Sequence, residues 1–229
     1  MLSFTSSLSP NNEAFAIFVT EKYDYKNKRD ILPKSTVQKI NSFLGVLKIK
    51  KNEDDISSFD ISDKQKCFII KVKKKYKSYS PQESGGSFFS YIKKNKNINK
   101  IVFCPDSLDF GTEELVNFFS QFIFGFNLKS YTFNKYKTLN KDKINKEINF
   151  TVITSNKEKI EKKYKYYHAI KEGIFLSRDL VSEPPNVLNP KVYAQEIHKL
   201  SKFGLKIKSY NEKELKKLGL NALLGVGLG

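Results

Sequence analysis

The stretch SRDLVSEPPNVLNP, residues Ser177–Pro190, divides this chain into two parts. A long helical pattern rich in lysine precedes it, and the adjacent residues Pro184 and Pro185 end that pattern. Neither proline carries an amide hydrogen, and each disfavours helical geometry in the residue before it. Asn189 and Pro190 then form an N-cap and first-turn pair, which predicts that a new helix begins there. The stretch therefore predicts a junction between two folding units.

Upstream of this junction, apolar runs typical of buried strands alternate with helical patterns. The predicted strands are Phe15–Thr20, Cys67–Val72, Lys100–Cys104 and Ile148–Ser155. The clearest helix carries apolar residues at intervals of three and four from Leu115 to Phe126, with Thr112 as its expected N-cap. Ser35 is expected to cap a helix that ends near Leu44, and the acidic stretch 51–64 to form a loop. This alternation predicts an α/β domain with a largely parallel or mixed sheet.

From Lys157 the pattern predicts one long helix that ends at Ser182. Its expected inner stripe consists of small and apolar residues, namely Ile170, Gly173, Ile174, Ser177, Leu180 and Val181. We therefore expect three parts: an N-terminal α/β domain over residues 1–156, a linker helix over 157–182, and the start of a second α/β domain over 183–229.

The last part is expected to hold two helices and two strands. Gly204 closes the first predicted helix, and Asn211 with Glu214 fits a capping box at the start of the second. The segment LKIKSY, Leu205–Tyr210, alternates apolar and polar residues as a half-buried strand does. The final run ALLGVGLG, residues 222–229, predicts another strand. The second domain would then be incomplete, because its last strand would have no sheet neighbours.

The net charge of +17 raises nucleic acid as a possible partner. Of the 41 basic residues, however, only Arg29 and Arg178 are arginines, the side chain suited to bidentate phosphate and guanine contacts. The abundance of Lys, Asn, Ile, Phe and Tyr also fits an A/T-rich coding sequence. The Lys/Tyr mixtures at 73–80 and 162–168 could contact phosphates and stack on bases, but they fit a solvated loop and an exposed helix face better. DNA binding is therefore possible and not favoured.

The sequence gives no indication of a membrane. Its most apolar runs, 14–19 and 118–126, are far shorter than the roughly 18 residues that a membrane span requires. The first residues do not have the pattern of a signal peptide. Cys67 and Cys104 both lie in strand-like apolar runs, which favours buried reduced thiols over a disulfide. Together these features predict a cytoplasmic protein.

Two glycine-rich motifs have only part of a phosphate-binding pattern. Gly225, Gly227 and Gly229 do not have the spacing of a dinucleotide loop, whose third glycine comes later. The helix and the acidic residue that follow in such a loop are not present either, so a strand is the preferred interpretation. The segment ESGGSFF, Glu83–Phe89, could hold an anion at a helix N-terminus. It lacks the lysine and the spacing of a P-loop, so an ordinary turn that leads into a helix is expected there.

The titratable residues do not form a recognisable catalytic or metal-binding motif. His168 and Glu172 are four residues apart, and Glu196 lies near His198, but these two histidines are the only ones in the chain and neither fits a His-Glu-x-x-His motif. Surface positions are the preferred interpretation, and neither cysteine has the partners of a catalytic thiol. We therefore assign no catalytic, metal-binding or cofactor-binding residue to this chain.

Residues Gly173–Gly229 closely resemble the opening of the catalytic domain in the leucyl aminopeptidase (cytosol aminopeptidase) family. The motifs RDLVSEPPNVLNP, YAQEI and EKELKKLGLNALLGVGLG occur in the same order and spacing as in that family. A second segment, Phe124–Thr138, resembles the end of a helix and the connection after it in the family's N-terminal domain. Residues 1–98 share only the general pattern. Leu228 departs from the family, in which many members carry glutamine.

The resemblance implies a metal-dependent aminopeptidase that removes N-terminal residues, leucine among them, from peptides. Two divalent cations, zinc or manganese, would activate a bridging water and polarise the scissile carbonyl. It also implies an N-terminal domain similar to a macro domain and assembly as a homo-hexamer.

In the family, the metal-ligand motifs follow the segment that matches GVGLG. This chain alone is therefore expected to bind no metal and to be inactive. The alternatives are a basic nucleic-acid-binding module and a non-catalytic regulatory or assembly subunit.

Overall fold

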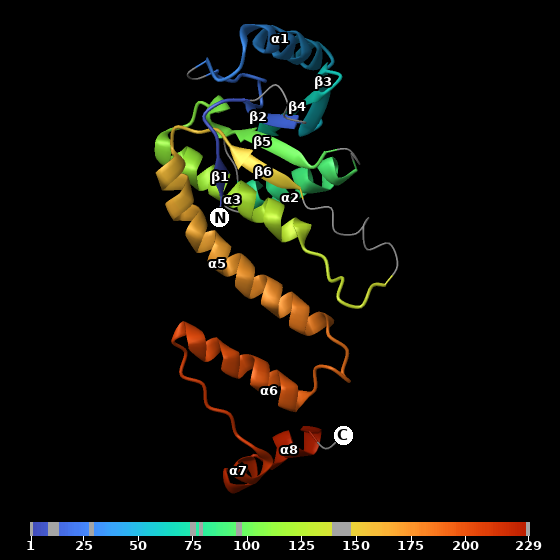
Figure 1. Ribbon diagram of the computed structural model, residues 1–229, viewed down its shortest axis with the longest axis vertical. Coiled ribbons are helices and arrows are strands. Elements are labelled where there is room, and N and C mark those ends of the chain that lie inside the picture. Colours follow the sequence, from blue (N-terminus) through green and yellow to red (C-terminus); the bar gives the residue numbers. More distant parts are fainter. Residues whose placement is uncertain are drawn as a thin grey trace. The chain divides into compact units, whose positions relative to one another are not determined.

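The computed structural model describes residues 2–8, 14–27, 30–73, 77, 80–94, 98–138 and 148–227 (Figure 1). It divides into two compact units, Met1–Leu176 and Ser177–Gly229. The first unit contains a six-stranded mixed sheet with helices on both faces, which confirms the predicted α/β fold class.

The sheet has the strand order β1-β6-β5-β2-β4-β3. Every neighbouring pair is parallel except β3 and β4, which form an antiparallel hairpin. The strands are β1 Ser3–Phe4, β2 Ala14–Thr20, β3 Ile56–Ser62, β4 Gln65–Val72, β5 Lys100–Cys104 and β6 Asn149–Val152.

Four of these strands confirm the prediction, with β6 shorter than expected. The expected loop at 51–64 is wrong for β3, an edge strand whose side chains are mostly polar and half-exposed, so it lacks the apolar run of a buried strand. The two-residue strand β1 also gave no signal in the sequence.

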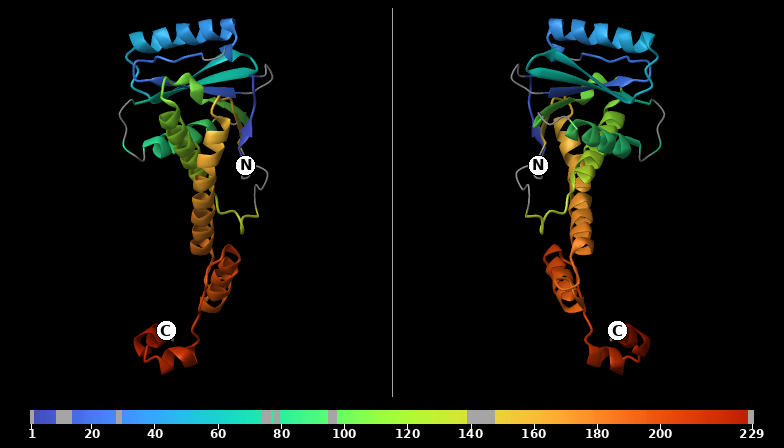
Figure 2. Two further views of the ribbon diagram at one scale, coloured as in Figure 1. Left: turned by 90° about the vertical axis from the view of Figure 1, so that its left-hand side faces the viewer. Right: turned by 90° about the vertical axis from the view of Figure 1, so that its right-hand side faces the viewer.

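The helices of the first unit lie on opposite faces of this sheet (Figure 2). Helix α1, Lys34–Ile49, covers one face, and α2, Ser80–Lys93, and α3, Thr112–Ser130, cover the other. The expected caps are wrong, because the N-cap residues of α1 and α3 are Pro33 and Gly111 and neither accepts a side-chain cap bond. Both helices instead owe their position to the apolar residues that they bury.

Phenylalanine dominates the core under α2 and α3. Phe103 of β5 is fully buried, and its ring lies 5.6 to 5.9 Å from those of Phe88, Phe119, Phe122, Phe126 and Phe150. Phe18 of β2 makes edge contacts with the same cluster. The other face of β2 presents Phe15, Ile17 and Val19 to α1. Strand β2 therefore reads as one continuous apolar run because both of its faces are buried.

Two glycines let α2 and α3 approach each other closely. A Cβ at Gly85 would lie 1.9 Å from the carbonyl oxygen of Phe122, and one at Gly125 would lie 1.9 Å from that of Gln82. The expectation of a turn at Glu83–Phe89 is therefore wrong. This segment lies inside α2, and its Gly85 allows the close packing on α3.

Helix α5, Lys157–Ser182, starts in the first unit and has the predicted bounds. Ile160 and Tyr164 are buried in the core of that unit, and Asn127 of α3 donates a hydrogen bond of 2.7 Å to the Tyr164 hydroxyl. The expected inner stripe further along α5 is not buried: Val181 is 86% exposed, and a Cβ at Gly173 would meet no atom within 4 Å.

The second unit is helical throughout its regular structure. Its elements are α6 Pro190–His198, the 3-10 helix η3 Lys199–Phe203, α7 Glu212–Lys217 and α8 Asn221–Gly227. Asn189 caps α6 through the Val192 amide, and Asn211 and Glu214 form the predicted capping box of α7. Gly204, at a φ of 86°, closes η3 as expected.

Both strands predicted for the second unit are wrong. Residues 205–210 are irregular, and residues 221–227 form α8. A strand needs a neighbour to pair with its backbone, whereas a helix satisfies its own amides, and the described residues of this unit contain no strand. Gly225 and Gly227 therefore lie in or at the end of a helix. Leu228 and Gly229 lie outside the described residues, as do Arg29 and most of 74–79.

Candidate functional site

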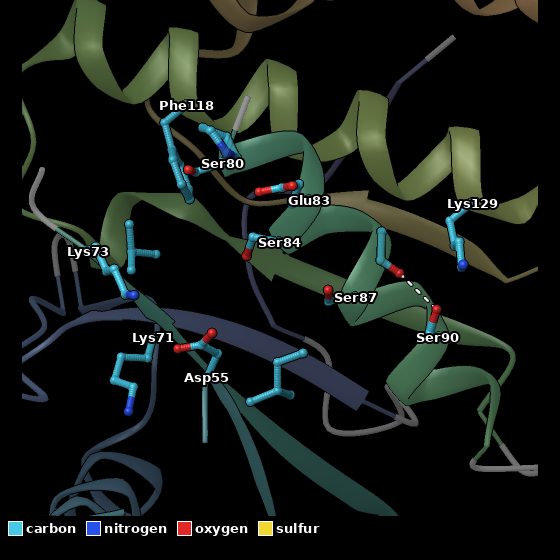
Figure 3. Close-up of a pocket in the computed structure, with 14 residues that line it drawn as sticks. Asp55, Lys71, Lys73, Ser80, Glu83, Ser84, Ser87, Ser90, Phe118 and Lys129 are labelled. Carbon is cyan, nitrogen blue, oxygen red and sulfur yellow. Dashed lines mark hydrogen bonds between the residues drawn. The ribbon is translucent and has the colours of Figure 1, made fainter. Parts of the chain in front are cut away.

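A cavity of the first unit lies where β4 ends and α2 begins (Figure 3). It measures about 600 Å³, and α2 contributes a row of serines, Ser80, Ser84, Ser87 and Ser90. Asp55 and Glu83 supply carboxylates, and Lys73 and Lys129 supply ammonium groups. The wall is therefore polar, with both signs of charge.

No serine of this cavity is paired with a base among the hydrogen bonds of the described residues. A serine nucleophile needs a base within hydrogen-bond reach, and both histidines lie elsewhere, on α5 and α6. The Ser90 hydroxyl donates to the Gly86 carbonyl oxygen at 3.1 Å, and the Lys71 ammonium donates to the Asn52 carbonyl oxygen at 3.1 Å. Both side chains are thus already engaged within the protein.

The carboxyl ends of β2 and β5, where many α/β proteins bind ligands, are covered here by a segment of the chain. Helices leave the neighbouring strands β2 and β5 toward opposite faces, so a crevice is expected at their carboxyl ends. The 3-10 helix η2, Pro105–Ser107, is buried there. The Ser107 hydroxyl accepts from the Phe18 amide at 2.8 Å and lies 2.7 Å from the Cys104 carbonyl oxygen.

Asp106 of η2 ties the end of β5 to the segment after β6. Its carboxylate is 3% exposed and accepts from the Thr154 hydroxyl at 2.6 Å and from the Ser155 amide and hydroxyl, each at 2.7 Å. A carboxylate with three donors is satisfied. Asp106 therefore joins the carboxyl ends of β5 and β6 and is not available as a catalytic base.

The two cysteines are buried free thiols, as predicted. Burial, with a further contribution from the charge of Asp106, raises the pKa of Cys104 from 9.0 to about 12. Burial, followed by the proximity of Cys104, raises the pKa of Cys67 well above its ordinary value. A catalytic cysteine needs a lowered pKa and access to solvent, so neither residue fits that role.

These raised pKa values predict a loss of stability in alkali. Below pH 9 both thiols keep their protons in the folded and in the unfolded chain. Between pH 9 and about 12 the unfolded chain releases protons that the folded chain retains, so the free energy of unfolding should fall as the pH rises. Urea unfolding of the wild type and of the Cys67→Ala/Cys104→Ala variant measures this. The decline should be smaller in the variant, and equal declines would contradict it.

The histidines occupy surface positions, as expected. His168 Nε2 lies 3.9 Å from Glu172 Oε1, but Glu172 is paired more closely with Lys171, at 2.8 Å. Hydrogen bonding by Lys171 is the main cause that lowers the pKa of Glu172. Glu196 pairs with Lys199 at 2.6 Å and not with His198. Over the described part of the chain, no group of three His, Cys, Asp or Glu residues could hold a metal ion.

One polar pair was not foreseen from the sequence. The Ser209 hydroxyl lies 2.7 Å from His198 Nε2, across η3 and the segment that follows it. The eleven-residue separation gave no motif, and only the fold brings the two together. The serine is exposed, and none of the described cavities includes either residue, so the pair has no substrate-binding surface around it.

Comparison with known proteins identifies the second unit. The model of the cytosol aminopeptidase family, catalytic domain, matches residues 175–229. A probable cytosol aminopeptidase of Agrobacterium fabrum is 38% identical over 149 residues, which are 64% of this chain and 29% of that protein. The chain is therefore similar to the cytosol aminopeptidase family, whose catalytic domain residues 175–229 match. A probable cytosol aminopeptidase of Phytoplasma australiense is 35% identical over 147 residues, with the same coverage of each chain.

Solved structures share the fold of this chain. A mutant of tomato leucine aminopeptidase superposes with a TM-score of 0.71 at 19% identity and covers 96% of this chain and 46% of its own. The bottromycin maturation enzyme BotP in complex with Mn gives a TM-score of 0.58 at 13% identity, over 91% of this chain and 40% of its own. At these identities the likeness shows the fold.

The matched region spans 29% of the length of the Agrobacterium and Phytoplasma relatives. No helix in the described ranges is long and apolar enough to cross a membrane.

Proposed function

We propose that this chain forms the N-terminal portion of a metal-dependent aminopeptidase, which hydrolyses N-terminal residues of peptides with leucine preferred. The observation that carries the proposal is the match of residues 175–229 to the catalytic domain of the cytosol aminopeptidase family. The first unit supports it, because its sheet and helices superpose on tomato leucine aminopeptidase.

In this proposal residues 1–156 are the N-terminal domain, 157–182 the linker helix and 183–229 the start of the catalytic domain. The two buried thiols and the satisfied Asp106 support a structural role for the first domain. The proposed assembly is a homo-hexamer, and the proposed compartment is the cytoplasm, in keeping with the reduced cysteines.

The metal chemistry lies outside the residues described here. Divalent cations, zinc or manganese, are proposed for the complete enzyme, and BotP is a fold relative solved with Mn. The donor sets of the described residues do not fit such ions. No catalytic step is therefore assigned to this chain, and the 229 residues by themselves are proposed to be inactive.

A chimera tests the function. Residues 1–229 are joined to the part of the Agrobacterium relative that follows its alignment with Gly229, and hydrolysis of leucine p-nitroanilide is measured with Mn²⁺. Because the chimera would restore a complete catalytic domain, its rate should exceed that of the chain alone by at least about 100-fold, a small part of a typical enzymatic acceleration.

The controls are the chain alone and the downstream part alone, each with Mn²⁺. Alanine and glutamate p-nitroanilides test the leucine preference, and gel filtration tests the hexamer. The proposal is wrong if a folded chimera shows only the background rate, or if the chain alone is as active as the chimera.

A further inference from the structure

A continuous groove of the first unit runs along one face of α2. The cavity of about 600 Å³ and a neighbouring cavity of about 230 Å³ share Ser90 and Lys129, so the two join there. All of their described lining residues lie between Asp55 and Lys129, within the first unit. From Ser80 to Ser90 the helix rises about 15 Å, which gives the groove at least that length.

The charged side chains of this groove differ between its two ends (Figure 3). Asp55 and Glu83 lie with Lys73 at the end where β4 leads into α2. The other end has no carboxylate among its described lining residues, and its ammonium groups are those of Lys93, Lys94 and Lys129. None of these six charged groups forms a salt bridge with another described residue. Only the first end therefore offers acceptors for a ligand ammonium.

Hydroxyl groups and apolar surface complete the groove. Ser84 and Ser87 form no side-chain hydrogen bond with another described residue, so both hydroxyls can donate and accept. The carboxylate end also has apolar surface, from Val72 at the end of β4, Pro81 in the first turn of α2 and Phe118 of α3. These features fit a ligand that carries an ammonium group beside an apolar side chain, polar groups along its length and a carboxylate at its far end.

We propose that this groove binds short peptides with free ends in an extended conformation. The N-terminal ammonium lies at Asp55 and Glu83, the first side chain lies on the apolar surface, and the C-terminal carboxylate lies at the lysines of the other end. A length of about 15 Å holds about four or five extended residues. This inference rests on the proposed function, in which such peptides are substrates, and it adds a place on the first unit that holds them.

Other charged ligands fit this groove less well. A phosphate-bearing ligand that filled it would meet the carboxylates of Asp55 and Glu83, and a purely cationic ligand would meet the three lysines of the other end. A peptide with both ends free places an opposite charge at each end. Because these charged side chains are exposed, each end should contribute only modestly to the affinity.

NMR spectroscopy of the ¹⁵N-labelled 229-residue chain tests the groove, with the tetrapeptide Leu-Gly-Gly-Gly as the probe. The amide signals of residues 83–90 and 129 should shift, and the shifts should approach saturation at about 20 mM peptide, as for a Kd in the millimolar range. Acetylation of the N-terminus or amidation of the C-terminus should each weaken binding about 3-fold or more, the effect of one exposed ion pair.

Variants of the chain assign each end of the peptide. Asp55→Asn/Glu83→Gln should weaken binding of the free tetrapeptide by about 3-fold or more but leave binding of the acetylated peptide unchanged. Lys93→Gln/Lys129→Gln should have the same effect for the free peptide and spare the amidated one. Lys34→Gln in α1, on the other face of the sheet, is the matched control and should not change binding.

The outcomes separate this inference from the proposed function, because the titration uses the 229-residue chain and measures no hydrolysis. Equal binding of the free and capped peptides would overturn the groove, as would the lack of a saturable shift. Equal shifts with sodium acetate would reveal a site for anions only and would also overturn it. Binding as described, beside an inactive chimera, would support the groove and contradict the function. An active chimera without binding by the chain would leave the function standing and remove the groove.

Discussion

The Gly125→Ala variant is expected to lose at least about 2 kcal/mol of unfolding free energy. The added methyl carbon would lie 1.9 Å from the Gln82 carbonyl oxygen and 2.5 Å from its carbonyl carbon. Both are backbone atoms, so α2 and α3 must move apart, and overpacking of this kind costs roughly 1–3 kcal/mol or more. That cost exceeds the gain of up to about 1 kcal/mol in helix propensity.

Gly86→Ala is the matched control for this variant. Gly86 lies in α2 and faces α3, but its Cβ would lie 3.7 Å from the nearest atoms, an ordinary contact. This variant should be unchanged or slightly more stable, because alanine favours the helix. Urea unfolding followed by near-ultraviolet circular dichroism of the tyrosines measures both. Equal free energies of unfolding for Gly125→Ala and Gly86→Ala would show that α2 and α3 do not pack closely at Gly125.

The Phe103→Ala variant should have the largest effect, a loss of about 3–5 kcal/mol. Phe103 is fully buried in β5 and contacts rings from both helices on that face of the sheet. Removing its ring leaves a cavity between strand and helices that rigid neighbours cannot fill. For a domain of ordinary stability, this loss is a large fraction of the total free energy of unfolding.

Phe203→Ala removes the same side chain from a site that is 71% exposed. Its cost should stay within about 0.5 kcal/mol, as for other exposed positions. The comparison of Phe103→Ala with Phe203→Ala by urea unfolding therefore tests the contrast between the two units. A loss at Phe203 as large as that at Phe103 would mean that the second unit has a core of its own.

The sequence predicts the first unit well where burial is unambiguous. Strand β5 has its predicted bounds, and α3 follows the apolar stripe from Leu115 to Phe126. The edge strand β3 was not predicted, because one of its faces is exposed to solvent and its polar residues resemble those of a loop. The glycines of α2 were misread because their role depends on a contact with α3, about forty residues away, which a local motif cannot reveal.

In the second unit, the local helix-capping signals were correct and the predicted strands were wrong. Signals that act locally were correct: the Asn189 cap, the capping box of Asn211 and Glu214, and the glycine that closes η3. Signals that require a partner were not. The alternating pattern at 205–210 predicts a strand, but a strand forms only beside another strand, and none is described in this unit.

At the candidate site, too, features that depend on contacts between distant residues could not be predicted from the sequence. The sequence assigns no catalytic or metal-binding residue to this chain, and that assignment stays a prediction. The closed crevice at the ends of β2 and β5 could not be foreseen, because it depends on how Ser107 meets the backbone of Phe18. The family resemblance came from the order of motifs around the proline pair, and the match over 175–229 agrees with it.

Hydrogen exchange of the 229-residue chain tests the central claim most directly: the first unit has a buried core, and the described residues of the second unit form none. The amides of β2, β4 and β5 should be the slowest and should exchange only on global unfolding. Those of α6, α7 and α8 should exchange near the unstructured rate, because no residue there is buried. Equal protection of both sets in the isolated chain would contradict the account.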